Sequence, residues 1–241
     1  MAREIAFVAD DFGMSAEINH AIELSHTFGG LHAAALMAGQ PGTAEAADRA
    51  RRLPGLQVGW HLHLNDSLPV TVERWPWGAS PARAGWSIGL FRSARELARR
   101  EIVRQWELFQ ETGLECRFVN CHHHLHAHPF VYRTLLEVLG PGFKGWIRLG
   151  ALKAFSPAPA FAAGAAAAEL FQRRRRRLSP WRATDTLWGV DRVFRMDAAE
   201  VAPAIAGLGD GFHEFLFHPR QPDATDPDTR CLLALRSFAS A

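Results

Sequence analysis

The chain has 241 residues and a formal net charge of +2, from 27 basic and 25 acidic side chains. This near balance gives no electrostatic reason to expect a nucleic-acid partner or a membrane surface as partner. The length suits one α/β domain, so residues 1–241 are predicted to form a single domain with a core that needs no disulfides.

The cysteines and the first residues of the chain indicate in which cellular compartment the protein is expected. The three cysteines are an odd number without Cys-x-x-Cys spacing, which argues against a disulfide framework and fits a reducing cytoplasm. The first residues contain no apolar stretch ending in a small-residue cleavage site, so no signal peptide is expected. No run of about 18 apolar residues occurs, so no stable membrane insertion is expected. Cytoplasmic localisation is therefore predicted.

Short apolar runs alternate along the chain with segments of helical periodicity. Strands are predicted at residues 4–9, 31–37, 56–64, 117–121, 145–149 and 211–217, with 190–194 as a further candidate. Helices are predicted at residues 15–28, 43–53, 93–112, 130–139, 197–205 and 226–238, the third opened by a capping box at Ser93-Ala94-Arg95-Glu96. Such alternation predicts parallel strands joined by crossover helices, and hence an α/β fold.

Two segments break this rhythm. Residues 66–92 are rich in Trp, Pro and Gly and are predicted to form a long functional loop. Its Trp75, Trp77 and Trp86 are candidates for stacking on a ligand, or equally for packing. Residues 151–188 contain an Ala-rich piece and the run Arg173 to Arg177. They are interpreted as a mobile insertion with a solvated basic face; a lid or an anionic-partner contact is the alternative.

Polar side chains gather where the predicted strands end. In α/β barrels and open parallel sheets, the carboxyl ends of the strands carry the functional site. The residues placed there are Asp10, Asp11, His61, His122, Arg148 and His218. The sequence pattern therefore predicts one site built from separate segments of the chain.

Histidines dominate this predicted site. Five of the twelve histidines lie within the stretch His122-His123-His124-Leu125-His126-Ala127-His128, and imidazole is the commonest protein metal ligand. His61 and His63 are two apart on a predicted strand and share a face. Two histidines and a carboxylate with open positions suit Zn, Mg, Mn, Fe or Co. A hydrolytic metal site is therefore predicted, in which a carboxylate acts as base and His218 is a candidate acid.

The motifs together resemble those of the YdjC-like carbohydrate deacetylases, which include chitooligosaccharide deacetylases and a branch associated with hopanoid biosynthesis. The resemblance rests on ADDFGMS followed by Ile-Asn, on Gly-x-His, on HHHxH and on a late Glu-x-x-x-His-Pro. It extends from residue 4 to about residue 222. It implies a single-domain distorted (β/α) barrel, related to polysaccharide deacetylases, that removes N-acetyl groups with one divalent metal. Mg is the metal that the resemblance favours, with Zn or another transition metal as the alternative.

The same resemblance assigns roles to individual residues. It implies metal ligation by Asp11, His61 and His122. Asp10 matches the catalytic base, His218 the late catalytic histidine, and Arg148 an arginine that supports the site. Residues expected to support the ligands or contact substrate are Asn120, His63, His124, His126 and Glu214. The family usually has Asp-Ser where this chain has Asn120-Cys121, a difference that bears on metal affinity.

The function predicted from the sequence is removal of an N-acetyl group from an amino sugar by a metal-dependent hydrolase. The expected partner is a small acetylated amino sugar, chitooligosaccharide-like, or the head group of a glycosylated lipid such as a hopanoid; homodimerisation is left open. One alternative is a different metal-dependent hydrolase, such as a phosphoesterase, which would favour more bridging carboxylates. Another is a non-catalytic metal- or nucleic-acid-binding protein, which would leave Asp10, Asp11 and His218 unexplained.

Overall fold

A computed structural model of the protein describes residues 2–156 and 159–238. Within these ranges, nine strands form one parallel sheet in the order β6-β8-β9-β1-β2-β3-β4-β5-β7. The strands are β1 (Arg3–Phe12), β2 (Ala33–Leu36), β3 (Gln57–Leu62), β4 (Phe118–Cys121), β5 (Trp146–Ile147), β6 (Ala151–Leu152), β7 (Arg182–Ala183), β8 (Thr186–Trp188) and β9 (Gly211–Phe217). The predicted α/β class is therefore confirmed.

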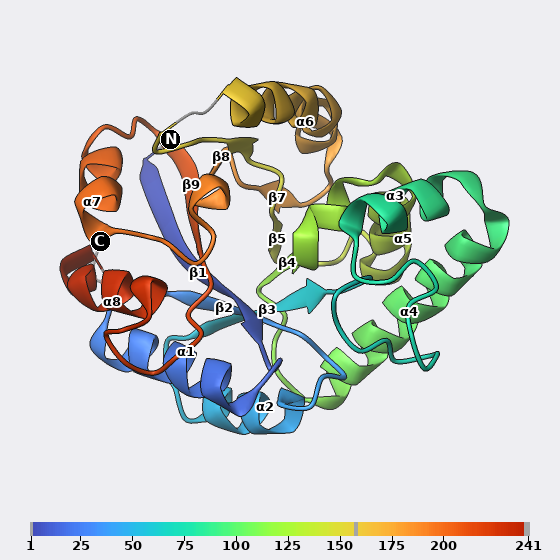
Figure 1. Ribbon diagram of the computed structural model, residues 1–241, viewed down its shortest axis with the longest axis horizontal. Coiled ribbons are helices and arrows are strands. Elements are labelled where there is room, and N and C mark those ends of the chain that lie inside the picture. The colour runs from blue at the N-terminus through green and yellow to red at the C-terminus, as the bar shows by residue number, and fades with distance from the viewer. Residues whose placement is uncertain (1, 157–158, 239–241) are drawn as a thin grey trace.

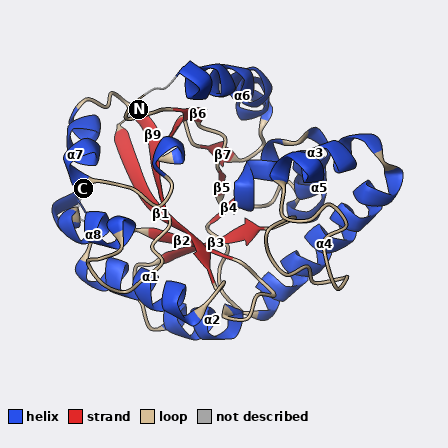
Figure 2. Ribbon diagram, in the orientation of Figure 1, coloured by secondary structure: helices blue, strands red, loops and turns tan. Residues whose placement is uncertain are grey.

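Helices surround the sheet on its outer side (Figures 1 and 2). The α-helices are α1 (Ala16–Phe28), α2 (Thr43–Arg51), α3 (Pro81–Leu90), α4 (Arg92–Glu111), α5 (Pro129–Leu139), α6 (Pro159–Leu178), α7 (Ala198–Ala206) and α8 (Pro227–Ala234). Three short 3₁₀ segments are η1 (His122–Ala127), η2 (Val190–Arg192) and η3 (Arg236–Phe238). Of the residues predicted at strand ends, Asp10, Asp11 and His61 lie on strands, whereas His122, Arg148 and His218 lie in the connections that follow strands.

The sheet curls into a half-barrel, and contacts between distant strands demonstrate the curvature. Strands β1 and β4 are three positions apart in the sheet, which corresponds to roughly 14 Å if the sheet were flat. Asn120 on β4 nevertheless donates a hydrogen bond of 2.9 Å to Asp10 on β1. Arg148, just after β5, also reaches Asp10 at 2.6 Å. The curl thus brings residues of separate strands together inside the half-barrel.

The core explains why the central strands lack the alternation of half-exposed strands. Helices and the interior of the curl cover the sheet, so both faces of a central strand are buried. On β1, Phe7, Val8 and Ala9 are all fully buried, and α1 packs Ala21 and Ile22 inward. Helix α1 begins where predicted, since the Ser15 hydroxyl accepts a hydrogen bond from the Ile18 amide.

The interpretation of residues 66–92 as one long loop is wrong in its last third. Helix α3 begins at Pro81, preceded by Ser80, whose hydroxyl caps the Arg83 amide. A serine followed by a proline is a helix-start signal that the prediction overlooked. The capping box at Ser93 is also wrong, because α4 begins at Arg92 and its N-cap, Phe91, makes no side-chain capping bond.

The tryptophans of this segment divide into two kinds. Trp75 and Trp77 are buried and stacked with ring centroids 5.6 Å apart. Their indoles donate hydrogen bonds to the carbonyls of Ser67 and Leu64. These two side chains hold the segment to the body of the protein, whereas Trp86 on α3 is 71% exposed.

Residues 151–188 are not an irregular insertion. Their described part contains the helix α6 and three strands, β6, β7 and β8, and these strands extend the sheet at both edges. Residues 157–158 lie outside the described residues. The candidate strand at residues 190–194 is wrong, since η2 occupies Val190–Arg192. The predicted terminal helix is divided into α8 and η3.

None of the helices in the described ranges is both long enough and apolar enough to cross a membrane.

The tight packing of β3 against β4 predicts a stability effect. A Cβ atom on the buried Gly59 would lie 2.5 Å from the ring of Phe118, which cannot easily move because it stacks on Trp146 at 4.5 Å. We expect Gly59→Ala to lower the free energy of unfolding by about 1–3 kcal/mol, measured by urea denaturation. Gly85→Ala in α3, where the nearest atom, on the side chain of Leu125, would be 4.0 Å away, is the control and should be neutral or stabilising. Equal stability of Gly59→Ala and wild type would contradict this account of the packing.

Candidate metal centre

A distortion at the end of β1 directs two adjacent carboxylates toward the same site. The register of β1 against β2 shifts between Ala9 and Phe12, and Asp11 has a left-handed φ of 65°. In a regular strand, successive side chains point to opposite faces. Here Asp10 Oδ1 lies 3.8 Å from His61 Nδ1 and Asp11 Oδ1 lies 3.4 Å from His61 Nε2. The bulge therefore lets both aspartates face one imidazole.

Strand register sets the orientation of His61. His61 on β3 and Asn120 on β4 are directly paired residues of neighbouring strands. The Asn120 carbonyl oxygen lies 2.6 Å from His61 Nδ1, and because an amide oxygen can only accept, Nδ1 carries the proton. His61 Nε2 then presents its lone pair toward Asp11. Asn120 thus fixes the orientation of the His61 ring through a neutral carbonyl.

Asp11, His61 and His122 form a three-residue cluster whose ligand atoms all lie within 4.8 Å of one another. His122 Nδ1 is 3.0 Å from Asp11 Oδ1. Two buried nitrogens of this cluster, His61 Nε2 and His122 Nε2, have no hydrogen-bond partner. Two atoms that each bind zinc at about 2.1 Å with tetrahedral angles are about 3.4 Å apart, the separation of the Asp11 and His61 atoms. These residues therefore fit a divalent metal.

A buried arginine holds Asp10 and Glu214. Arg148 donates to both Asp10 oxygens, at 2.6 and 2.9 Å, and to Glu214 Oε1 at 2.7 Å. Burial alone would raise the pKa of Asp10, but the charge of Arg148, with His61, holds it below its ordinary value. Burial raises the pKa of Glu214 to about 7, although Arg148 opposes the shift. Asp10 therefore stays ionised at neutral pH, as expected of a residue supported by Arg148.

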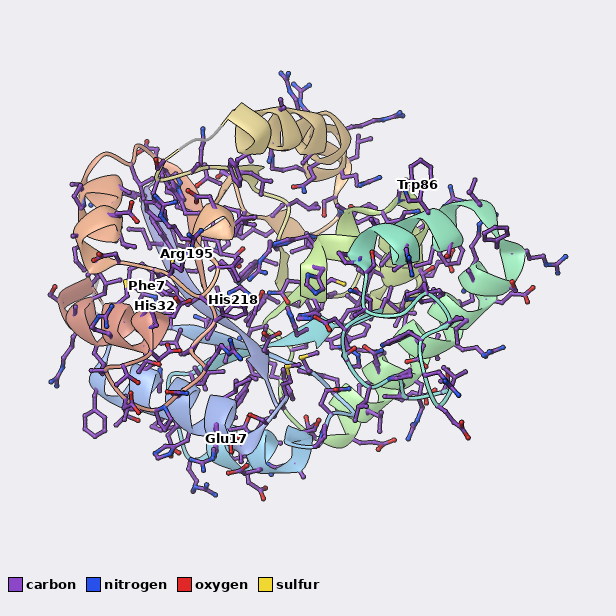
Figure 3. All side chains as sticks on the ribbon, in the orientation of Figure 1. Phe7, Glu17, His32, Trp86, Arg195 and His218 are labelled. Atoms are coloured by element: carbon purple, nitrogen blue, oxygen red, sulfur yellow. The ribbon has the colours of Figure 1, made fainter. Side chains whose placement is uncertain are left out.

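His218 follows β9 and faces the interior of the half-barrel. Figure 3 shows it inside the ring of helices, in contrast to Trp86, which projects from the outer edge. Its backbone amide donates a 2.7 Å bond to Asp228 Oδ2, and the Phe194 ring packs edge-on at 5.2 Å. The Nδ1 atom of His218 is buried without a hydrogen-bond partner. A ring nitrogen is thus available to a ligand inside the curl.

The other predicted histidines are spread over different surroundings. His63 is buried and is not a member of the cluster; its ring lies between the Ala38 carbonyl at 3.1 Å and the Ser67 hydroxyl at 3.0 Å. His126 is also buried, and its Nδ1 has no partner. Burial lowers the pKa of His63 and of His126 to about 3, so both are neutral. His124 stands beside His126 with ring centroids 6.0 Å apart.

Two residues near the site were not predicted from the sequence. Asp228 is fully buried and accepts bonds from the amides of His218 and Met196, so it fixes the turn that carries His218. Asp66 lies 3.4 Å from His123 Nε2. Only the position of Asp228 just inside a helix could have suggested a capping role, and no sequence signal places Asp66 beside the histidines.

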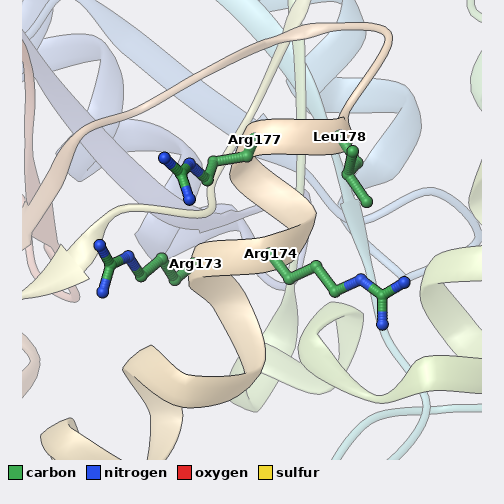
Figure 4. Close-up of a pocket in the computed structure, with 4 residues that line it drawn as sticks. All are labelled: Arg173, Arg174, Arg177 and Leu178. Carbon is green, nitrogen blue, oxygen red and sulfur yellow. The ribbon is translucent and has the colours of Figure 1, made fainter.

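The arginines of the run Arg173 to Arg177 fall into two groups, one bonded to the body of the protein and one at its surface. Arg175 donates to the Ala127 carbonyl in η1, and Arg176 donates to the Leu149 carbonyl after β5 at 2.7 Å. Arg173, Arg174 and Arg177 instead line a surface hollow of about 700 Å³ with Leu178 (Figure 4). The run therefore anchors α6 near the candidate site, and only part of it is a solvated basic face.

A parallel α/β half-barrel with a histidine–carboxylate cluster inside its curl is thus the class that fold and site define. The sequence model of the family described as YdjC-like protein matches residues 4–236. The chain belongs to this family, as the resemblance implied.

Curated relatives agree with this assignment, and a solved structure shares the fold. A carbohydrate deacetylase of Vibrio cholerae serotype O1 (strain M66-2) is 30% identical over 56% of this chain and 54% of its own. One of Geobacillus stearothermophilus is 34% identical over 57% and 56%. The chain spans about half the length of the curated relatives it matches. An Enterococcus faecalis V583 protein, proposed to cleave cellobiose-phosphate, has the same fold with a TM-score of 0.69, 15% identity and coverage of 100% and 95%.

The bond between Asn120 and His61 predicts an effect on metal affinity. Asn120→Ala removes the acceptor that fixes the His61 tautomer, so we expect the affinity for Zn²⁺ or Co²⁺ to fall about 10–100-fold, measured by competition with a chelator. His63→Gln is the matched control, because His63 is equally buried on the same segment but outside the cluster, and it should bind the metal as wild type does. Loss of affinity only in the control would show that the ligands are misassigned.

The buried carboxyl of Glu214 predicts a dependence of stability on pH. Its pKa rises from an ordinary 4.5 to about 7 in the folded protein, so the folded state holds a proton that the unfolded state has lost. Wild-type stability should therefore fall as pH rises from about 4.5 to 7, by up to about 3 kcal/mol relative to Glu214→Gln. Urea denaturation of the metal-free protein tests this, with the exposed Glu137→Gln as control. Parallel pH profiles for wild type and Glu214→Gln would refute it.

Proposed function

We propose that the protein is a metal-dependent N-deacetylase that acts on an acetylated amino sugar. The observation that carries the proposal is the cluster of Asp11, His61 and His122 directly beside Asp10, which Arg148 keeps ionised. Family membership and relatives named carbohydrate deacetylases support a sugar substrate. Both a chitooligosaccharide and a glycosylated lipid head group such as that of a hopanoid carry the required N-acetyl group.

Asp11, His61 and His122 are the residues that would hold the metal. When bound there, a divalent ion polarises a carbonyl and lowers the pKa of a water molecule from 15.7 toward about 7. One carboxylate and two imidazoles suit Zn, Co, Mn or Fe, whereas Mg prefers oxygen ligands and octahedral geometry. The donor set therefore favours a transition metal, whereas the family resemblance favours Mg.

Asp10 accepts a proton in the proposed reaction. Its two oxygens are held by Arg148 and Asn120, so the carboxylate has little freedom to rotate away. A water oxygen bonds to the acetyl carbon, and the proton that it loses passes to Asp10. The pKa of Asp10 is below its ordinary value, which makes Asp10 a weak base. It therefore accepts a proton only from a water molecule whose own pKa has been lowered.

His218 supplies the proton of the second half-reaction. The bond between the acetyl carbon and the sugar nitrogen breaks, and the nitrogen leaves as an amine only if it is protonated. The partnerless Nδ1 of His218 inside the curl suits this transfer, and Asp228 keeps the turn of His218 in place. The products are acetate and the free amino sugar. One proton of the water is then on Asp10, the other stays on the oxygen that bonds to carbon and is released when acetic acid ionises, and return of the Asp10 proton to His218 through solvent restores both side chains.

The proposal predicts that Asp10→Asn abolishes most activity. An amide cannot accept the proton, so we expect kcat for acetate release to fall about 10²–10⁴-fold while the Co²⁺ affinity stays within a few-fold of wild type. The assay uses metal-stripped protein reloaded with Mg, Mn, Co or Zn and a panel of N-acetylated sugars. Asp48→Asn, an exposed carboxylate on α2, is the control and should retain full activity.

The same panel separates the alternatives. Metal-dependent release of acetate that disappears in Asp10→Asn supports the deacetylase. Release of phosphate from phosphate esters, without acetate, would replace it by a phosphoesterase. Binding of a metal without turnover of any substrate would contradict the proposed reaction but leave the metal centre standing.

A further inference from the structure

A second group of possible metal ligands lies next to the first, and two of its three members have no part in the proposed reaction. Asp66, His122 and His123 each offer a ligand atom, and these atoms lie within 4.8 Å of one another. The side chains of Asp66 and His123 are 56% and 37% exposed, against 10% and 1% for Asp11 and His61. His122 belongs to both groups. The second group therefore lies on the solvent side of the first.

The geometry of the outer group suits a bound ion. Asp66 Oδ2 and His123 Nε2 are 3.4 Å apart, too long for a strong hydrogen bond. The same distance separates two ligands that each bind zinc at about 2.1 Å in a tetrahedral site. The rings of His122 and His123 are close neighbours, with centroids 4.2 Å apart. His122 Nε2 is buried and has no hydrogen-bond partner, so this nitrogen has an unused lone pair or proton.

The backbone holds these residues together at a cost. Asp66 has a φ of 49° and His123 a φ of 53°, in the left-handed region that residues other than glycine rarely adopt. Conformations of this kind persist where the surrounding structure imposes them, often at ligand sites. Here they turn a carboxylate from the segment after β3 toward an imidazole of η1.

We propose that Asp66, His122 and His123 form a second binding site for a transition-metal ion, which shares His122 with the inner cluster. Two imidazoles and one carboxylate select Zn, Cu, Ni or Co over Mg, because nitrogen ligands follow the Irving–Williams order. The exposure of Asp66 and His123 leaves this ion open to solvent, so the outer site is the weaker of the two. The site is independent of which substrate the protein acts on.

Sharing of His122 has a consequence for regulation. A neutral imidazole has one nitrogen lone pair for a metal, since its other nitrogen carries the proton. When both sites are filled, only one of the two ions has His122 as a ligand, so each ion weakens the binding of the other. Excess zinc should then inhibit the protein after the first equivalent has activated it, whereas excess Mg should not.

The experiment is equilibrium dialysis of the metal-stripped full chain against Zn²⁺, with the bound metal counted by elemental analysis. We expect wild type to bind a first equivalent tightly and a second at least tenfold more weakly, and His123→Gln and Asp66→Asn to lose only the second. His20→Gln, an exposed histidine on α1, is the matched control and should retain both. Dialysis against Mg²⁺ should give no second equivalent.

Three results would overturn the proposal: a single equivalent in wild type, a second equivalent that persists in both His123→Gln and Asp66→Asn, or its loss in His20→Gln. A further variant separates this proposal from the proposed function. His61→Ala should lose the inner ion, and with it any acetate release, but should still bind one zinc ion that disappears when His123→Gln is added. If the outer ion binds and no acetate is ever released, the second site stands and the deacetylase proposal fails.

Discussion

The buried guanidinium of Arg148 is the interaction on which the site depends. An isolated charge in the interior of a protein is strongly unfavourable, and it becomes tolerable only with close charged partners that use its donors. Arg148 has one ionised partner, Asp10 on β1, and a second acceptor in Glu214 on β9, whose pKa burial raises to about 7. Because Arg148 follows β5, these bonds cross the concave side of the sheet and join its two halves. The same contacts keep Asp10 ionised, so a bond that supports the curl of the sheet also sets the chemistry of the candidate base.

Backbone strain is concentrated around this site. In the described ranges, the non-glycine residues with positive φ are Asp11, Asp66, His123, His124 and Phe194. Asp11 belongs to the inner cluster, Asp66 and His123 to the outer one, and Phe194 packs on His218. Left-handed backbone costs roughly 1–3 kcal/mol for such residues. The regular strands and the packed helices stabilise the fold enough to offset this cost.

The class of the fold and the principal candidate residues could be predicted from the sequence because both follow from local patterns. Apolar runs ending in Asp10, His61 and Asn120 indicate parallel strands, and parallel strands bring their carboxyl ends to one edge. Strand β5 falls within the strand predicted at residues 145–149. The strands at the two edges, β6 and β7, could not be predicted in this way, since they have two residues each and two residues have no period. Helix α6 lies in an Ala- and Arg-rich segment that indicates solvent exposure rather than a place beside the site.

The division of roles among the histidines depends on three-dimensional contacts. His61 and His63 share a face in the sequence pattern, but only His61 has a paired neighbour, Asn120, on the next strand. The chain leaves helical geometry at His123 and His124, so no simple spacing rule applies to the histidine run. The contact between Asp66 and His123 joins residues 57 positions apart, and nothing in the local sequence of either indicates it.

The proposed function requires that Asp11, His61 and His122 bind a divalent metal beside Asp10. The measurement to make is anomalous diffraction from crystals soaked in a low concentration of Zn²⁺ or Co²⁺. We expect a peak bonded to Asp11 Oδ1 and His61 Nε2 and to a ring nitrogen of His122, with His61 Nδ1 still bound to Asn120. Absence of a peak from this cluster, with metal bound elsewhere on the chain, would contradict it.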